Sequence, residues 1–209
     1  MLTLTNEDCM QMMARYPDGY FQLAIVDPPY GNNLNGGRST KHKWSKKINW
    51  DKCNKGWNLT KPSIEYFTEL RRVSKNQIIW GGNYFANMLP NSECWLIWDK
   101  GQRDFSLADG EMAWASFDKA MRIHTIHRAI SNQEDRIHPT QKPVALYKWL
   151  LHNYAKPGDH ILDTHLGSAS IAIACHDYGY DLTGCELDPE YFAAAMKRVE
   201  AHVAQQKLF

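Results

Sequence analysis

One short segment, Asp27-Pro28-Pro29-Tyr30, combines a carboxylate, two prolines and an aromatic ring. It follows an apolar run over 21–26 that has the composition of a buried strand. The prolines prevent the strand from continuing, because each fixes φ and lacks an N–H donor. The segment is therefore predicted to project stiffly from the carboxyl end of a strand, where ligands bind in open α/β sheets. Its carboxylate and exposed carbonyl oxygens could accept hydrogen bonds while the ring stacks on a flat group.

A second candidate for ligand binding is the turn over 163–170, between a predicted strand and a predicted helix. It contains Gly167, and a glycine at this point lets a ligand approach the N–H groups at the helix N-terminus. Glu186 stands at the end of the next predicted strand, where a carboxylate accepts both hydroxyls of a ribose in nucleotide-binding α/β folds. On their own, these two features also fit an ordinary tight turn and a surface acid.

The residues from 31 to 60 are predicted to form a long loop, which in a compact domain is typical of a functional or a disordered segment. Basic and aromatic residues are interleaved there, and Asp51 is the only acid among them. Basic charge suits contact with phosphates, and aromatic rings suit stacking on bases. A solvated, flexible insert is the alternative. The basic residues are Arg38, Lys41, Lys43, Lys46, Lys47, Lys52 and Lys55, and the tryptophans are Trp44, Trp50 and Trp57.

The composition of the whole chain narrows the class of protein. With 209 residues, of which 44% are hydrophobic, the chain is long enough for one domain with a substantial core. The net charge of +1 means that any surface for nucleic acid must be local. The five cysteines are an odd number without a C-x-x-C pair. A disulfide framework and a zinc site are therefore disfavoured, no metal is expected, and a reducing compartment is favoured.

No apolar run is long enough to cross a membrane, so no membrane partner is expected. The N-terminus also lacks a basic start followed by an apolar run, which a secretory signal would need. Both observations favour a cytoplasmic protein.

The order of the predicted elements indicates an α/β fold. Strands alternate with helices along the chain, which is typical of a doubly wound, mostly parallel sheet. Residues 111–117 and 121–127 are predicted to pair as a hairpin, with Asp118-Lys119 at its turn. This hairpin would add one antiparallel edge strand. No repeat or linker divides the chain, so a single domain over 1–209 is expected.

Four motifs in a fixed order carry a resemblance to a known family: 27–30, then His138-Pro139-Thr140-Gln141-Lys142-Pro143, then 163–170, then 186–190. Together they resemble the S-adenosylmethionine-dependent amino-group DNA methyltransferases of the permuted β group, in which the catalytic half precedes the cofactor half. The resemblance covers nearly the whole chain. It implies a seven-stranded Rossmann-like sheet, S-adenosylmethionine as cofactor, DNA as partner and a place in restriction and modification. It also implies a catalytic half over about 1–117, a short target-recognition segment over about 118–137 and a cofactor half over about 138–209.

The resemblance also implies roles for individual residues. Asp27 and the Pro28 carbonyl would accept the two hydrogens of the target amino group, Pro29 would stiffen the turn, and Tyr30 would stack on the flipped-out base. The stretch 111–114 resembles a motif that lines the base pocket. The basic loop would contact DNA through Arg38, Lys41, Lys43, Lys46 and Lys47. The cofactor would be bound by Asp8, Cys9, Asp27, Thr140, Lys142, Asp163, His165, Gly167, Ser168 and Glu186. The turn over 163–168 would hold its methionine part, and Glu186 would hold its ribose.

The chain departs from the family in the glycine turn. The usual proline and aromatic residue are Thr164 and His165 here, and the second glycine is Ala169. His165 would still cover the cofactor, but a charge on its ring would make binding sensitive to pH. Ala169 would be tolerated if that position is already helical.

Several alternatives stay open. The first motif residue is more often Asp in the adenine enzymes and Ser in the cytosine enzymes, so Asp27 favours adenine-N6 over cytosine-N4. RNA or the side chain of a protein glutamine are further substrates of this chemistry. A non-catalytic relative that binds nucleic acid would keep the basic loop and lose the cofactor site. The short target-recognition segment also fits a homodimer, since some relatives are dimers.

Overall fold

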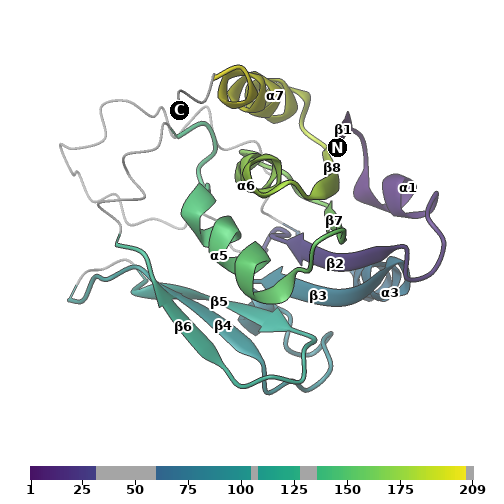
Figure 1. The fold of residues 1–209 in the computed structure, drawn as a ribbon. Helices are drawn as coiled ribbons and strands as arrows, with labels where there is room; N and C mark the ends of the chain where they lie inside the picture. The colour runs from purple at the N-terminus through teal and green to yellow at the C-terminus, as the bar shows by residue number, and fades with distance from the viewer. Residues whose placement is uncertain (32–59, 105–107, 128–135, 206–209) are drawn as a thin grey trace.

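The computed structural model describes residues 1–31, 60–104, 108–127 and 136–205. They form one eight-stranded sheet with helices on both faces (Figure 1). One face is covered by α5 (Val144–Tyr154), α6 (Ser170–Tyr178) and α7 (Pro189–Val203). The other is covered by α1 (Cys9–Met13) and α3 (Ile64–Val73), and η1 (Gly82–Tyr84) is a short 3₁₀ turn.

The eight strands lie in the order β1-β8-β7-β2-β3-β5-β4-β6. Their bounds are β1 (Leu2–Asn6), β2 (Phe21–Val26), β3 (Ser74–Trp80), β4 (Trp95–Asp99), β5 (Gly110–Ala115), β6 (Arg122–Thr125), β7 (His160–Asp163) and β8 (Asp181–Glu186).

The first five strands of this order run parallel, and this places the candidate residues together. β1 pairs with β8, β8 with β7, β7 with β2 and β2 with β3, all in parallel. After β2 the chain continues to β3 on one side of the sheet, and after β7 it continues to β8 on the other side. The strand order therefore reverses between the neighbours β2 and β7. A crevice for ligands is expected at the carboxyl ends of the strands beside such a reversal. Asp27 follows β2 there, and β7 and β8 end at Asp163 and Glu186.

The predicted fold class is confirmed, with differences at one end of the sheet. There are eight strands instead of seven, and the predicted 111–127 hairpin is wrong. β5 is antiparallel to both of its neighbours, β3 and β4, while β6 pairs in parallel with β4. The antiparallel strand is therefore inserted inside this end of the sheet and is not its outermost member. Burial explains the choice, because Ala113 and Ala115 are completely buried whereas Ile123 in β6 is 61% exposed.

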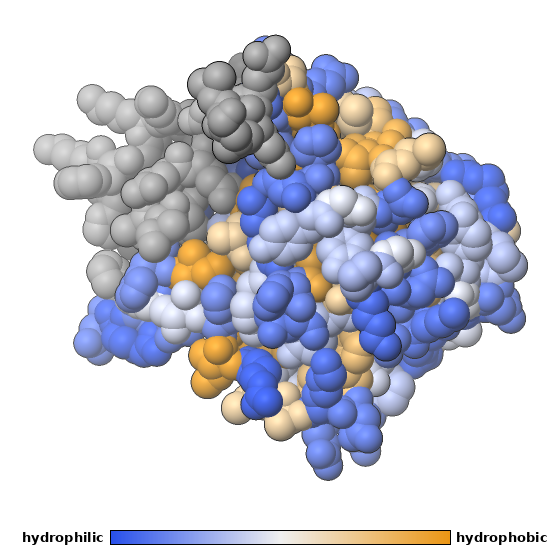
Figure 2. Space-filling model, viewed as in Figure 1, coloured by the Kyte–Doolittle hydropathy of each residue, from blue (hydrophilic) through white to orange (hydrophobic). Residues whose placement is uncertain are grey.

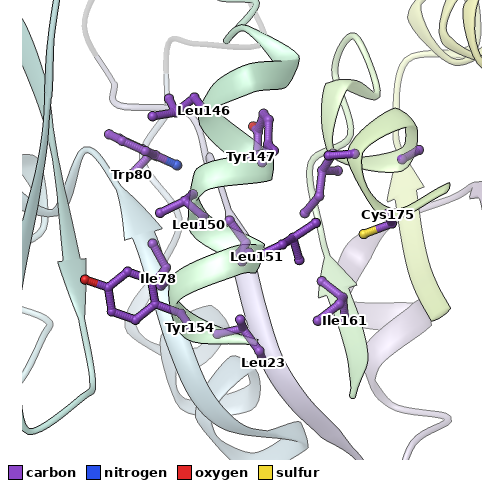
Figure 3. Packing of buried hydrophobic residues seen from close by; sticks show 14 of the residues in the cluster. Leu23, Ile78, Trp80, Leu146, Tyr147, Leu150, Leu151, Tyr154, Ile161 and Cys175 are labelled. Atoms are coloured by element: carbon purple, nitrogen blue, oxygen red, sulfur yellow. The ribbon is translucent and has the colours of Figure 1, made fainter. Parts of the chain in front are cut away.

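The core that supports the candidate site lies between α5 and the middle of the sheet. Leu146 and Leu150 point from α5 toward Trp80 and Ile78 on β3, and Leu151 lies on the side of Ile161 on β7 (Figure 3). On the outer surface, hydrophobic side chains are scattered between hydrophilic ones on the face in view (Figure 2), as is usual for proteins. Within the described ranges, no helix is both long and apolar enough to cross a membrane.

Candidate active site

Asp27 is held by two side chains at the carboxyl end of β2. The Tyr30 hydroxyl donates a hydrogen bond of 2.5 Å to Asp27 Oδ1. The ammonium of Lys142, from the segment before α5, forms an ion pair with Asp27 Oδ2. The Lys142 side chain is only 2% exposed and that of Asp27 is 16% exposed. A carboxylate has about four lone-pair positions, so Asp27 keeps acceptor capacity beyond these two contacts.

Glu111 completes a cluster of alternating charges around Lys142. Lys142 Nζ lies 3.2 Å from Glu111 Oε2, and Lys100 Nζ lies 2.7 Å from Glu111 Oε1. Because β5 is antiparallel to β3, its first residues lie at the edge where the parallel strands end. Glu111 was expected near the base pocket only through the family motif, and its pairing with Lys142 and Lys100 was not expected. The inserted strand order is what brings these groups together.

The cluster shifts the pKa values of its members in different directions. Burial raises the pKa of Asp27, although Lys142 opposes the shift. Burial alone would lower the pKa of Lys142, but Asp27 and Glu111 outweigh it and raise this pKa. Burial also acts to raise the pKa of Glu111, yet Lys142 and Lys100 lower it overall. At neutral pH, Lys142 is therefore charged and Glu111 ionised, and Asp27 is the carboxylate that accepts a proton more readily.

The Tyr30 ring lies against two features of the segment after β3. It stacks on Tyr84 with ring centroids 4.8 Å apart and an interplanar angle of 15°. It also lies against Gly81, which has a φ of +70°. A Cβ atom at position 81 would come within 2.2 Å of Tyr30 Cε1. Glycine is thus required at 81 by its backbone conformation and by the ring, and Tyr84, which is 38% exposed, extends the aromatic surface.

We expect Gly81→Ala to lower the free energy of unfolding by about 2–5 kcal/mol, since it combines left-handed strain with overpacking against Tyr30. Gly158→Ala is the matched control, because Gly158 has a φ of +86° but no atom lies within 4 Å of a Cβ placed there. That variant should lose only about 1–2 kcal/mol. Urea unfolding measures both. Equal losses would show that the contact with Tyr30 contributes nothing.

A cavity of about 230 Å³ adjoins Asp27 at the carboxyl edge of the sheet. It is lined by every predicted cofactor residue except Asp163: Asp8, Cys9, Asp27, Thr140, Lys142, His165, Gly167, Ser168 and Glu186. Asp163 lies beneath the cavity, 2% exposed, and accepts a 3.0 Å hydrogen bond from the His165 N–H. Burial raises the pKa of Asp163 to about 8. Lining residues that were not predicted include Glu7, His138, Gln141, Tyr147, Leu187 and Tyr191.

Glu186 is oriented by the backbone around it. Its Oε2 accepts a 2.9 Å hydrogen bond from the Gly167 N–H, and its Oε1 accepts a 3.0 Å bond from the Asp188 N–H. Burial raises the pKa of this carboxyl group. A carboxylate has about four lone-pair positions, so Glu186 keeps acceptor capacity for a ligand in the cavity.

The two departures in the glycine turn have structural consequences. Ala169 is left-handed, with φ 54° and ψ 32°, and stands just before α6. Alanine was expected to be tolerated only if this position were helical, and it is not helical. The position keeps the left-handed conformation that favours glycine. Burial lowers the pKa of His165 to about 4. Its ring is neutral at neutral pH, so the expected charge is absent there.

The predicted DNA contacts Arg38, Lys41, Lys43, Lys46 and Lys47 lie outside the described residues. The same holds for positions 128–135 of the predicted target-recognition segment, whose described part contains β6.

Comparison with known proteins shows that the fold is shared with DNA methyltransferases. The chain is 24% identical to the type II methyltransferase M.HinfI of Haemophilus influenzae over 243 residues, which covers 94% of this chain and 68% of that protein. The crystal structure of the M1.HpyAVI–SAM complex shares the fold, with a TM-score of 0.63, 19% identity and coverage of 95% of this chain and 100% of that chain. The cytosine-N4-specific PvuII DNA methyltransferase matches with a TM-score of 0.63, 12% identity and coverage of 100% and 88%.

A family model described as DNA methylase, of the N6/N4 methyltransferase type, matches residues 79–197. This segment is more than half of the chain and includes Glu111, Lys142, the turn after β7 and Glu186. The protein therefore belongs to the N6/N4 DNA methylase family, the amino-group DNA methyltransferases.

Proposed function

We propose that this protein transfers a methyl group from S-adenosylmethionine to the exocyclic amino group of adenine in DNA. The observation that carries the proposal is the position of Asp27, whose carboxylate faces the same cavity as Glu186 and the glycine turn. Acceptors for a target amino group and acceptors for a nucleoside thus meet in one space. Catalysis is assigned to Asp27, Pro28, Pro29 and Tyr30.

The donor and acceptor set of the cavity fits this cofactor. Glu186 retains acceptor capacity for a ribose, and the glycine turn allows close approach. Asp8 caps α1 through Oδ1, which accepts bonds from the N–H groups of Met10 and Gln11, and its Oδ2 is available for an adenine amino group. When bound, S-adenosylmethionine supplies a methyl group on a sulfonium, which is a good leaving group.

The chemical role of Asp27 follows from the electronic structure of the target. The lone pair of an adenine amino nitrogen is delocalised into the ring, which makes the nitrogen a poor nucleophile. Asp27 and the Pro28 carbonyl would accept hydrogen bonds from its two N–H groups. These bonds would favour a pyramidal nitrogen whose lone pair points at the methyl group. This stabilisation grows toward the transition state. The raised pKa of Asp27 also suits it to receive the proton that leaves after transfer.

The target base would reach Asp27 by flipping out of the duplex, which costs a few kcal/mol and is offset by stacking on aromatic rings. Tyr30, stacked on the exposed Tyr84, supplies such a surface. The basic residues of the 31–60 loop would contact phosphates, so activity should fall steeply with salt. Adenine is preferred to cytosine because position 27 is Asp, where the cytosine enzymes more often have Ser.

The direct test is to sequence modified bases in DNA from a methylation-free host that expresses the protein. N6-methyladenine at a fixed short motif is expected. N4-methylcytosine would overturn the choice of base and retain the chemistry. Unmodified DNA would contradict the proposal, and a failure to bind S-adenosylhomocysteine as well would favour the non-catalytic relative.

We expect Glu186→Ala to weaken binding of S-adenosylhomocysteine by about 10- to 100-fold, because hydrogen bonds to a charged group contribute about 1.5–3 kcal/mol. Glu186→Gln should lose less, since it keeps one acceptor. Isothermal titration calorimetry measures both affinities. Glu190→Ala, at an exposed site in the first turn of α7, is the control. Unchanged affinity in both Glu186 variants would remove this residue from the cofactor site.

A further inference from the structure

A chain of three side chains runs from the core to the cavity wall. The hydroxyl groups of Tyr66 and Thr164 are 2.7 Å apart, and Thr164 Oγ1 lies 2.9 Å from His165 Nδ1. Tyr66 is 3% exposed and Thr164 is 2% exposed. The Tyr66 ring also packs edge-on against the His165 ring, with centroids 5.4 Å apart and an interplanar angle of 73°. The imidazole is thus oriented by a ring contact and by a hydrogen bond.

The number of protons on the three side chains determines which of them donates each hydrogen bond. Thr164 Oγ1 is the only hydrogen-bond partner of the Tyr66 hydroxyl among the described residues, so the phenol proton must go to it. Thr164 then has its own proton to donate, and its remaining side-chain partner there is His165 Nδ1. If Nδ1 carried a proton instead, the buried Thr164 proton would have no acceptor, at a cost of about 1–3 kcal/mol. His165 Nδ1 is therefore an acceptor, and Nε2 carries the ring proton.

The protonated nitrogen faces the cavity. His165 lines the cavity, and its Nε2 makes no hydrogen bond within the described part of the chain. Across the described residues, Trp80 Nε1 is the side-chain polar atom that is both inaccessible and without a hydrogen-bond partner. Since Nε2 of His165 has no partner either and does not share this inaccessibility, it is accessible. Asp8 is close enough for its charge to act on the His165 ring. His165 therefore lines the same cavity as Asp8, near enough to sense its charge.

We propose that His165 is a specificity residue that donates its Nε2–H to an acceptor on the adenosine part of the cofactor, and that Tyr66 and Thr164 are positioning residues that fix this tautomer. The proposal rests on the proposed function, because that function identifies the ligand of the cavity. The adenosine part is favoured over the amino-acid part because His165 lies beside Asp8, the residue assigned to adenine. A phenylalanine ring at position 165 would cover the cofactor but could not donate this hydrogen bond.

The tautomer is testable without any ligand. In protein labelled with ¹⁵N-histidine near neutral pH, long-range ¹H–¹⁵N spectra should show a pyridine-type Nδ1 and a pyrrole-type Nε2 for His165. The chain has 9 histidines, so the signal is assigned by its loss in His165→Phe. Thr164→Val should allow the Nδ1–H form to appear. An Nδ1–H tautomer or a charged ring in the wild-type protein would overturn the proposal.

Binding experiments test the contact itself. His165→Phe should lower the affinity for S-adenosylhomocysteine by about 3- to 10-fold, which is the range for the loss of one hydrogen bond. The same loss should persist with 5′-methylthioadenosine, which lacks the amino-acid part. A loss that disappears with this ligand would place the acceptor on the amino-acid part and overturn the assignment.

Analogues of S-adenosylhomocysteine that lack one ring nitrogen identify the acceptor. One deaza analogue should bind the wild-type protein more weakly than S-adenosylhomocysteine does. The His165→Phe variant should bind that analogue and S-adenosylhomocysteine equally well. Identical affinities of His165→Phe and wild type for S-adenosylhomocysteine would overturn this inference and leave the proposed function intact. A wild-type protein that does not bind S-adenosylhomocysteine would overturn both, whatever tautomer the spectra show.

Discussion

Asp27→Ala is expected to lower the rate of methyl transfer by at least about 10²–10³-fold, the usual effect of removing one preorganised group that stabilises the transition state. In the proposed reaction, this carboxylate accepts a hydrogen bond from the target amino group that strengthens as charge develops on the nitrogen. Binding of S-adenosylhomocysteine should be largely retained, because Glu186 and the glycine turn are unchanged. Incorporation of tritiated methyl groups into DNA and calorimetric affinity, on one preparation, measure the two effects. Full activity of the Asp27→Ala variant would contradict the catalytic role assigned to Asp27.

The contacts of Asp27 call for two matched variants. Tyr30→Phe keeps the ring and removes the hydroxyl that donates to Asp27 Oδ1, so it should lose much less activity than Tyr30→Ala, which removes the stacking surface as well. Equal losses in these two variants would argue against stacking on the base. Asp109→Ala, at an exposed acid just before β5, should leave the transfer rate unchanged. Comparable unfolding free energies must be verified for all four proteins, since Lys142 loses one of its partners in Asp27→Ala.

The predictable part of the site consists of groups that follow their own strands. Asp27, Asp163 and Glu186 each stand where a local apolar run ends, and parallel strands bring such ends to one edge without further information. Thr140 and Lys142, which come before α5, were predicted only through the resemblance to the family, and they line the same cavity. Asp163 differs because it lies beneath the turn, a detail of packing that the spacing of residues does not contain.

The unpredicted part depends on which strands pair. Residues 111–117 and 121–127 are adjacent, alternating segments, and a hairpin is the local solution for them. The chain instead inserts β5 between β3 and β4, because its buried residues need a neighbour on each side. Only this order puts Glu111 beside Lys142. The Lys142–Asp27 pair likewise joins residues separated by 115 positions, and no local pattern reports such a contact.

The buried charge cluster leads to the other large expected effect, on stability. Lys142→Met should lower the free energy of unfolding by about 3–5 kcal/mol near pH 8, since it leaves the carboxylates of Asp27 and Glu111 without their shared cation. Lys148→Met is the control, because Lys148 pairs with Asp177 at a side chain that is 35% exposed. That loss should be about 0–1 kcal/mol. Urea unfolding of both variants and of the wild type measures the differences.

The sign of the pH dependence separates this cluster from a simple loss of packing. Lys142 lowers the pKa values of Asp27 and Glu111, whereas burial raises them. Without Lys142, burial and mutual repulsion remain, so the pKa of Asp27, which is already raised in the folded wild type, rises further. A group with a raised pKa adds stability at low pH and loses it as the pH increases through that pKa. The deficit of Lys142→Met should therefore shrink by up to about 2 kcal/mol between about pH 8 and about pH 6.

Glu111→Gln provides the decisive comparison, because it removes one of the two carboxylates that Lys142 neutralises. In the double variant Glu111→Gln/Lys142→Met, Asp27 is the only acid left in the cluster and the repulsion is gone. The double variant should then be more stable near pH 8 than Lys142→Met alone, which is a non-additive result for residues in contact. A deficit independent of pH, or strict additivity, would mean that Lys142 acts through the packing of its side chain and not through its charge. If the predicted pattern is found, Lys142 is what allows Asp27 to remain an ionised acceptor in a buried site.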